Sequence, residues 1–213
     1  MAHSPFSGCP NLPRLYLPPM NPAKLPPHII LIALNVAIFL LQTAGFDWRL
    51  QGALWQPENP NYHIWQWFTH LFLHESLMHL GFNMFALGSF MPHLLRVWTA
   101  KRVWALYFAS GLAGAAAYLP FMASNGSMLG ASGAVFGVLA AFSAVYPKAP
   151  LSLMFIPVPV QARYLVGGLV LYEVFAQISG VSLFGDNIAH MAHGGGALMG
   201  WAFAWQWQRQ MQR

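Results

Sequence analysis

The sequence predicts an all-α integral membrane protein with six transmembrane helices in one bundle and an amphipathic outer loop between the first and second helices. Hydrophobic residues make up 57% of the 213 residues. Charged residues make up only 7%, against roughly 25% in soluble domains. Apolar segments also recur with short gaps from residue 28 onward, which leaves no room for a separate soluble domain.

Six apolar segments each approach the roughly 20 residues that cross the hydrocarbon core as a helix. They lie at about 28–45, 69–91, 102–122, 129–146, 162–180 and 187–207. The segment between the first two spans mixes aromatic and polar residues, so we expect this outer loop to lie partly in the membrane interface. The predicted membrane domain is therefore 28–207, followed by a short basic cytoplasmic tail at 208–213.

Residues 1–27 hold half of the 16 prolines and lack the apolar core of a cleavable signal peptide. This composition predicts a flexible cytoplasmic tail. A single cysteine, Cys9, excludes a disulfide within the chain.

The basic residues predict how the spans are oriented. With the N-terminus inside, nine of the ten fall on the cytoplasmic side and only Arg49 lies outside. Both termini are then cytoplasmic, and a bacterial inner (plasma) membrane is the simplest location. The basic residues are scattered over short loops, which argues against a nucleic-acid-binding face.

Three polar side chains are expected at similar depth in the bundle. Ser132, His193 and His79 lie 15 to 17 residues from the inner ends of three spans that run in the same direction. At the rise of an α-helix this is roughly 22 to 26 Å, which places all three near the outer face.

Small residues predict that two of these spans touch. Each span has two glycines four residues apart, directly after its polar side chain: Gly133 with Gly137, and Gly196 with Gly200. Such faces let transmembrane backbones approach closely, which would bring Ser132 to His193. Phe136 lies one turn below Ser132 and could stack on the imidazole.

A serine beside a neutral histidine predicts nucleophilic catalysis, because the imidazole can take the hydroxyl proton and later return it. No carboxylate is expected to join them, since Asp186 lies two turns before His193. The sequence thus predicts a dyad. The alternative is structural: Ser132 would cap the fourth helix and His193 would satisfy a backbone carbonyl.

His79 and Asn83 are four residues apart and share one helical face. Polar groups inside a membrane favour a functional role. Their side-chain N–H groups could stabilise the oxyanion of a tetrahedral intermediate, together with the backbone N–H of Ser132. The alternative is that they only hydrogen bond between helices, a role that we favour for His70 and His74.

Three motifs together resemble the rhomboid intramembrane serine proteases: "GASG" around Ser132, "AHGGGALMG" from Ala192, and "HLFLHESLMHLGFN" from His70 to Asn83. Their order matches as well, and the resemblance covers residues 28 to about 207. It implies a six-helix rhomboid bundle with a water-filled crevice, a serine-type endopeptidase that needs no cofactor or metal, and transmembrane protein substrates in the lipid bilayer. It leaves the substrate and the oligomeric state open.

The resemblance also implies roles for individual residues. Ser132 resembles the nucleophile, His193 the general base, and His79 and Asn83 the oxyanion donors. The supporting residues are Phe136, Gly130, Gly133, Gly196, Gly200 and His190. His193 rather than His190 fits the family pattern, which has a glycine three and seven residues after the histidine.

Further features follow from the resemblance. Residues 179–186 resemble a mobile cap with hinges at Gly180 and Gly185, and the fifth span resembles a lateral substrate gate. Many members carry Trp-Arg in the first outer loop where this chain has Trp65-Gln66. Glu173 has no assigned role, and we expect it to face the interior and meet a polar partner.

Two alternative functions are compatible with parts of the sequence. "HESLMH" is similar to the zinc motif HExxH but has one residue too many, so its histidines would be rotated by about 140° on a helix. This spacing disfavours a membrane metalloprotease. A catalytically inactive rhomboid-like protein that binds transmembrane helices is the other alternative, but Ser132 and His193 are both present.

Overall fold

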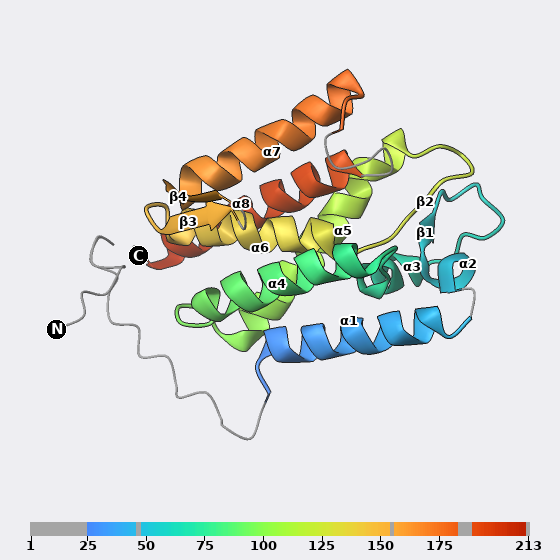
Figure 1. Ribbon diagram of the computed structural model, residues 1–213, viewed down its shortest axis with the longest axis horizontal. Coiled ribbons are helices and arrows are strands. Elements are labelled where there is room, and N and C mark those ends of the chain that lie inside the picture. The colour runs from blue at the N-terminus through green and yellow to red at the C-terminus, as the bar shows by residue number, and fades with distance from the viewer. Residues whose placement is uncertain (1–24, 46–47, 154–155, 183–188, 212–213) are drawn as a thin grey trace.

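The computed structural model describes residues 25–45, 48–153, 156–182 and 189–211. Six helices of 14 to 22 residues dominate it: α1 (Pro27–Thr43), α4 (Leu77–Leu94), α5 (Ala100–Tyr118), α6 (Ser132–Val145), α7 (Ala162–Ser179) and α8 (His190–Met211). Shorter helices connect them: α2 (Trp48–Gly52), α3 (Gln66–Thr69), η1 (His70–Phe72) and η2 (Leu119–Phe121). The prediction of a mostly helical chain is confirmed (Figure 1).

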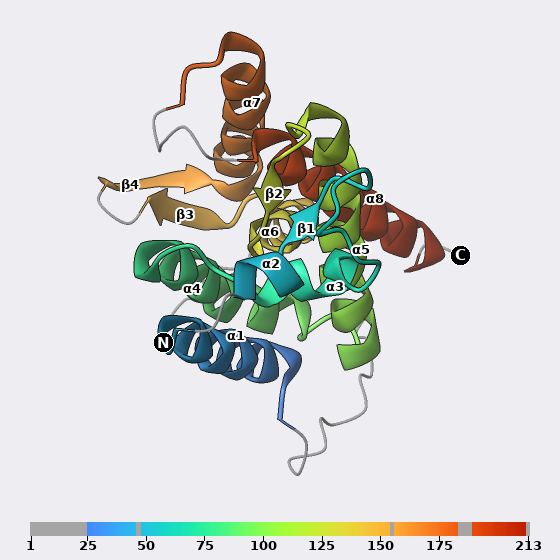
Figure 2. The ribbon, with the colours of Figure 1, turned by 90° about the vertical axis from the view of Figure 1, so that its right-hand side faces the viewer.

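Helix α6 lies at the centre of the bundle, where it contacts α4, α5, α7 and α8 (Figure 2). Its sequence explains this position. Glycine, alanine and valine provide eight of its nine buried residues, so neighbouring helices can approach its backbone. Helix α1 packs against α4 at the edge of the bundle.

Helix α4 begins later than the sequence analysis expected, at Leu77 instead of residue 69. Ser76 is extended, with φ −150°, and its side chain accepts a hydrogen bond from the backbone N–H of His79. This is the geometry of a helix N-cap. The residues before it form α3 and η1 instead, so His70 and His74 lie outside α4.

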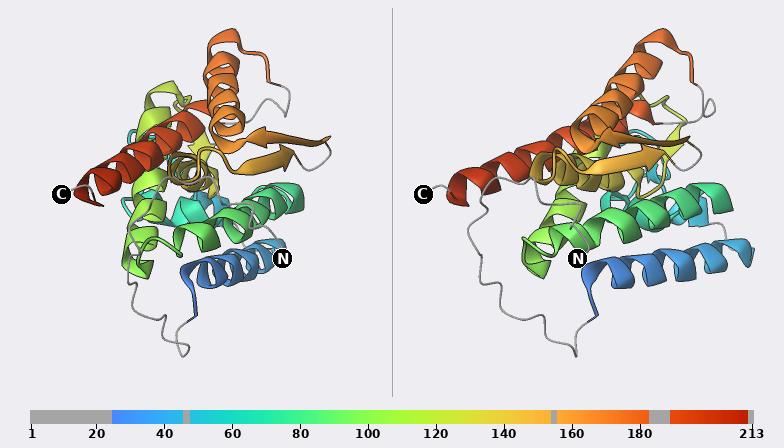
Figure 3. Two further views of the ribbon diagram at one scale, coloured as in Figure 1. Left: turned by 90° about the vertical axis from the view of Figure 1, so that its left-hand side faces the viewer. Right: turned by 60° about the vertical axis from the view of Figure 1, so that its left-hand side comes forward.

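The chain is not entirely α-helical. Strand β1 (Leu54–Trp55) pairs antiparallel with β2 (Ser127–Met128), and β3 (Pro150–Leu153) pairs antiparallel with β4 (Ile156–Gln161). Prolines at 150 and 159 disfavour a helix in this segment but are tolerated in an edge strand. The β3–β4 hairpin projects from the bundle beside α7 (Figure 3).

The segment between α1 and α4 is held together by the fully buried side chain of Gln66. Its amide oxygen accepts a hydrogen bond from the backbone N–H of His63, and its amide nitrogen donates to the carbonyls of Asn61 and Leu50. The glutamine that departs from the Trp-Arg pattern therefore ties this segment to itself.

One stretch of the described residues, Ala100–Phe121, is both long and apolar enough to cross a membrane, and α1 and α6 are apolar but shorter. The last helix continues to Met211, beyond the expected domain end at residue 207. Several expectations fall outside the described residues: most of the Pro-rich tail, residues 183–186 of the expected cap with Gly185 and Asp186, and the last two residues of the chain.

Candidate active site

Ser132 is the first residue of α6, and the chain reaches it through a turn that only glycine suits. Gly130 has φ +124°, a conformation that L side chains rarely adopt, and its N–H donates to the carbonyl of His70 at 2.8 Å. A Cβ on Gly130 would also lie 2.7 Å from Cε1 of His79. Gly130 therefore brings the His79 imidazole close to the start of α6.

Helices α6 and α8 approach closely through their glycines. A Cβ on Gly196 would overlap the carbonyl oxygen of Gly133, and a Cβ on Gly200 would overlap that of Gly137. Backbone contact of this kind allows no side chain at these positions. The two glycine pairs singled out in the sequence thus face each other and bring Ser132 beside α8.

The Ser132 hydroxyl meets the histidine that the glycine pattern indicated. Oγ of Ser132 lies 2.8 Å from Nε2 of His193, a hydrogen-bond distance. The ring of Phe136 stacks on the imidazole, with the ring centroids 4.4 Å apart and the planes inclined by 5°. Phe136 therefore fixes the plane of the ring that faces Ser132.

Ser132 does not cap α6 in the structure. Ala131 occupies the N-cap position of α6, and no side chain caps the helix there. The Ser132 hydroxyl bonds to His193 instead, so this side chain serves a contact between helices.

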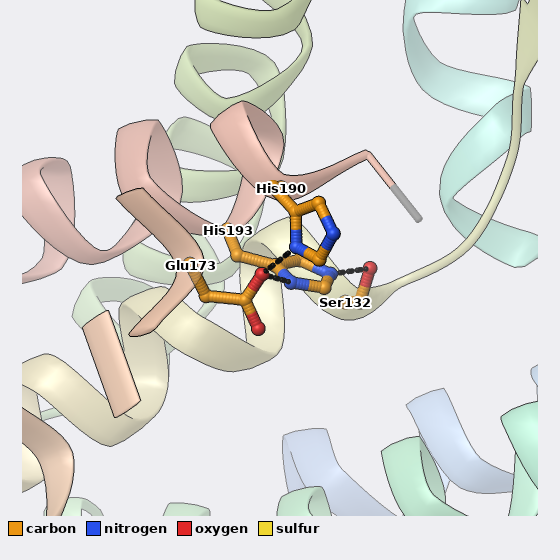
Figure 4. Close-up of polar contacts among 4 residues, drawn as sticks. All are labelled: Ser132, Glu173, His190 and His193. Atoms are coloured by element: carbon orange, nitrogen blue, oxygen red, sulfur yellow. Dashed lines mark hydrogen bonds and ion pairs between the residues drawn. The ribbon is translucent and has the colours of Figure 1, made fainter. Parts of the chain in front are cut away.

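A carboxylate lies beside the histidine, and here the sequence analysis was wrong. Oε2 of Glu173, on α7, lies 2.5 Å from Nδ1 of His190 and 3.0 Å from Nδ1 of His193 (Figure 4). The expectation that no carboxylate would reach His193 considered only residues near it in the chain. Packing of α7 against α8 brings Glu173 there from a different helix.

His190 contacts the same carboxylate as His193. Its Nδ1 hydrogen bonds to Glu173, its side chain is buried, and it does not contact Ser132 in the described hydrogen bonds. The expectation that Glu173 faces the interior and meets a polar partner is confirmed, and the partners are His190 and His193. The available signal was an acidic residue in the middle of the apolar span 162–180, where Glu173 has no other charged residue beside it.

His79 and Asn83 lie on the first turns of α4. Asn83 is buried, and its Nδ2 makes no hydrogen bond within the described part of the chain, so an N–H donor is available. The imidazole of His79 lies against Gly130, two residues before Ser132. The His79 imidazole thus lies at the start of α6, and Asn83 lies one turn further along α4.

The other two histidines of this segment have structural contacts. Nδ1 of His70 hydrogen bonds to the carbonyl of Gln66 at 2.7 Å. Burial lowers the pKa of His70 to about 4, so its ring is neutral at physiological pH. The backbone of His74 exchanges two hydrogen bonds with the side chain of Gln42.

The near-match to a zinc motif does not form a helical site. His74 and Glu75 precede the N-cap of α4, and the Glu75 carboxylate turns outward to within 3.7 Å of Arg49. Among the described residues, no group of three or more His, Cys, Asp or Glu side chains is placed to hold a metal ion.

Comparison with known proteins identifies the family. The Rhomboid domain model matches residues 61–210. The chain is 32% identical to Rhomboid protein 1, mitochondrial, of Saccharomyces cerevisiae over 93% of its length, and 31% identical to the human presenilin-associated rhomboid-like protein, mitochondrial, over 61%. Rhomboid protease GlpG of an Enterobacter species is 27% identical over 83% of the chain and 61% of the relative. The chain spans 59% of the yeast protein and 34% of the human one.

These relatives also correct the expected location. The names of the yeast and human proteins both carry the word mitochondrial, so the expectation of a bacterial inner membrane with cytoplasmic termini is wrong. The bias of basic residues distinguishes the two sides of a membrane but does not identify the membrane. Three motifs, their order along the chain and the matching domain model lead to one conclusion: the chain belongs to the rhomboid family.

Proposed function

We propose that the chain is an intramembrane serine endopeptidase that cleaves transmembrane segments of other membrane proteins through an acyl-enzyme. One observation carries the proposal, the 2.8 Å contact between Oγ of Ser132 and Nε2 of His193. An unprotonated imidazole nitrogen at this distance can take the proton of a serine hydroxyl. The name of the Enterobacter relative, a rhomboid protease, supports the same chemistry.

The first half of the reaction forms the acyl-enzyme. The Ser132 hydroxyl passes its proton to Nε2 of His193 as Oγ attacks the carbonyl carbon of the peptide bond. The tetrahedral intermediate then collapses, the C–N bond breaks, and the His193 imidazolium gives its proton to the leaving amine. In the second half, water loses a proton to His193 and attacks the ester carbonyl. The C–O bond to Ser132 then breaks, the His193 imidazolium returns the proton to Oγ, and the acid product leaves.

The negative oxygen of the tetrahedral intermediate needs N–H donors. We propose that the side chains of His79 and Asn83 supply two of them and the backbone N–H of Ser132 a third. The unpartnered Nδ2 of Asn83 supports this role, because a buried donor with no acceptor is costly unless a ligand satisfies it.

The proposed setting is a membrane, with the six long helices as the spans of a six-helix bundle. Large apolar side chains are exposed on the outside of these helices: Leu40, Phe82, Phe85, Leu171, Ile178 and Leu198. Exposed apolar side chains on several helices suit a lipid environment better than water. We further propose a mitochondrial membrane, on the strength of the yeast and human relatives.

The proposed chemistry favours substrates whose helix opens easily. The carbonyls of a regular helix are engaged in hydrogen bonds, so the scissile carbonyl is reached only after local unwinding. Glycine near the scissile bond lowers the cost of unwinding, and leucine raises it. A reporter helix with glycine at these positions should therefore be cleaved faster than one with leucine.

A fluorescent fluorophosphonate tests the proposal on the purified protein in detergent, because it labels only an activated serine. We expect labelling of the unaltered protein and none of Ser132→Ala or His193→Ala. A transmembrane reporter substrate provides a second reading that does not depend on access of the probe. A folded protein that neither reacts with the probe nor cleaves the reporter would refute the proposal and favour the inactive helix-binding alternative.

A further inference from the structure

Glu173 is the only acidic residue in the six long helices, and it is 6% exposed. Burial of a carboxylate costs several kcal/mol unless other groups compensate its charge. The proposed dyad chemistry gives this side chain no task. The groups around Glu173 must therefore compensate its charge.

The groups around it are two histidines on one face of α8. His190 and His193 are three residues apart, so they lie one above the other on the helix. A single carboxylate oxygen, Oε2 of Glu173, lies 2.5 Å from Nδ1 of His190 and 3.0 Å from Nδ1 of His193 (Figure 4). The contact with His190 is a hydrogen bond. That with His193 has the distance of one, although the ring N–H is not aimed at the oxygen.

The contact between Glu173 and Nδ1 of His193 favours one tautomer of this imidazole. A carboxylate oxygen only accepts hydrogen bonds, so it favours a proton on Nδ1 of His193. A neutral imidazole has one N–H, and the proton on Nδ1 leaves the lone pair of Nε2 free. Nε2 lies 2.8 Å from Oγ of Ser132, so its lone pair can accept the proton of the hydroxyl.

The same carboxylate faces the charge that forms during the reaction. When His193 takes the proton from Ser132 it becomes an imidazolium, with Oε2 of Glu173 at 3.0 Å. The attraction between these charges is strong because the pair is shielded from water. His190 holds the carboxylate in place through the shorter contact, so the carboxylate does not need to move when the charge forms.

We infer that Glu173 is a positioning residue of the active site, which holds His193 in the Nδ1–H tautomer and stabilises its imidazolium, with His190 as the brace of the carboxylate. The inference rests on the proposed function. It replaces the expected serine–histidine dyad with a Ser132–His193–Glu173 arrangement whose acid comes from α7, a helix that contributes neither the nucleophile nor the base.

Kinetics of matched variants test the inference. Glu173→Gln keeps the size and an acceptor oxygen but removes the charge, and we expect kcat to fall by about 10- to 1,000-fold. The upper limit lies below the roughly 10⁴-fold loss seen when the aspartate of a serine protease triad becomes asparagine. KM should change by less than about threefold, because the charge acts on the transition state. Glu173→Asp keeps the charge and should recover part of kcat. Glu58→Gln is the control, since Glu58 is exposed in the outer segment.

The tautomer of His193 can be measured in the absence of substrate. ¹⁵N chemical shifts of labelled histidine distinguish Nδ1–H from Nε2–H, and His193→Ala assigns the signal. We expect Nδ1–H in the unaltered protein and a mixture in Glu173→Gln. A structural role for Glu173 would change the unfolding temperature but would leave the tautomer of His193 unchanged.

The outcomes separate this inference from the proposed function. An unaltered protein without labelling or cleavage refutes the function, whatever the variants do. If the unaltered protein is active, an unchanged kcat in folded Glu173→Gln, or a Glu173→Asp variant as impaired as Glu173→Gln, overturns the role of Glu173. Should Glu173→Gln fail to fold, Glu173→Asp decides: kcat within about tenfold of the unaltered protein supports the role, and kcat at the level of Ser132→Ala overturns it.

Discussion

The hydroxyl oxygen of Ser132 lies 2.8 Å from Nε2 of His193, although 61 residues separate them in the chain. The contact depends on glycines, because α6 and α8 touch through the backbones of Gly133 with Gly196 and of Gly137 with Gly200. This close approach of the two backbones brings the short side chain of Ser132 within reach of the His193 imidazole. The glycines that determine the packing of α6 on α8 therefore also bring Ser132 and His193 together.

Gly200→Ala should destabilise the protein. The added Cβ would overlap the carbonyl oxygen of Gly137, and overpacking of this kind costs about 1–3 kcal/mol. Gly194→Ala is the matched control on the same helix, because a Cβ there meets nothing within 4 Å. There alanine should add up to about 1 kcal/mol through its helix propensity. Thermal unfolding in detergent measures both, and equal shifts for the two variants would contradict close packing of α6 on α8.

Phe136→Ala should slow the reaction without preventing folding. The phenyl ring stacks on His193, and aromatic pairs contribute about 0.5–1.5 kcal/mol beyond their area, so up to about tenfold in kcat is expected. Phe136→Tyr keeps the ring and should retain most of the activity. Phe85→Ala removes an exposed ring on α4 and serves as the control. A tyrosine variant as slow as the alanine variant would argue against stacking as the cause.

The approach of Ser132 and His193 could be predicted from the sequence alone. Glycines four residues apart and a similar count to the inner ends of the spans predict that Ser132 and His193 meet at one depth. Both signals lie within single helices, where the period of the helix determines what shares a face. The motifs around Ser132, His193 and His79 are likewise defined by residue spacing within a single segment of the chain.

Glu173 shows where sequence reasoning stops. Its burial could be expected from its place in an apolar span, but its contact with His193 depends on how α7 rotates against α8, which no local pattern encodes. The start of α4 was missed for a different reason. Apolar residues continue through α3 and η1, so hydropathy shows no break where Ser76 caps the helix. The β3–β4 hairpin was missed because the segment between two spans was read only as a connection.

Asn83→Ala should lower kcat with little change in KM. Loss of one oxyanion donor costs about 10²–10³ in kcat in other serine proteases. The side chain is buried with a free Nδ2, so it is available to the intermediate and not needed by a protein acceptor in the described residues. Asn125→Ala changes an exposed asparagine and is the control. A rise in KM at constant kcat would assign Asn83 to substrate binding instead of the oxyanion.

Gln66→Ala should loosen the segment between α1 and α4. The buried amide accepts from the N–H of His63 and donates to the carbonyls of Asn61 and Leu50, and each buried group left without its partner costs about 1–3 kcal/mol. Hydrogen exchange of residues 50–66 should rise and the unfolding temperature should fall. Gln51→Ala, an exposed change in the same segment, should alter neither. Gln66→Met gives a sharper test, because it keeps the approximate size and length but lacks the amide and brings no charge. A methionine variant as stable as the unaltered protein would show that the side chain acts by filling space, whereas stability as low as that of the alanine variant would assign its effect to the hydrogen bonds.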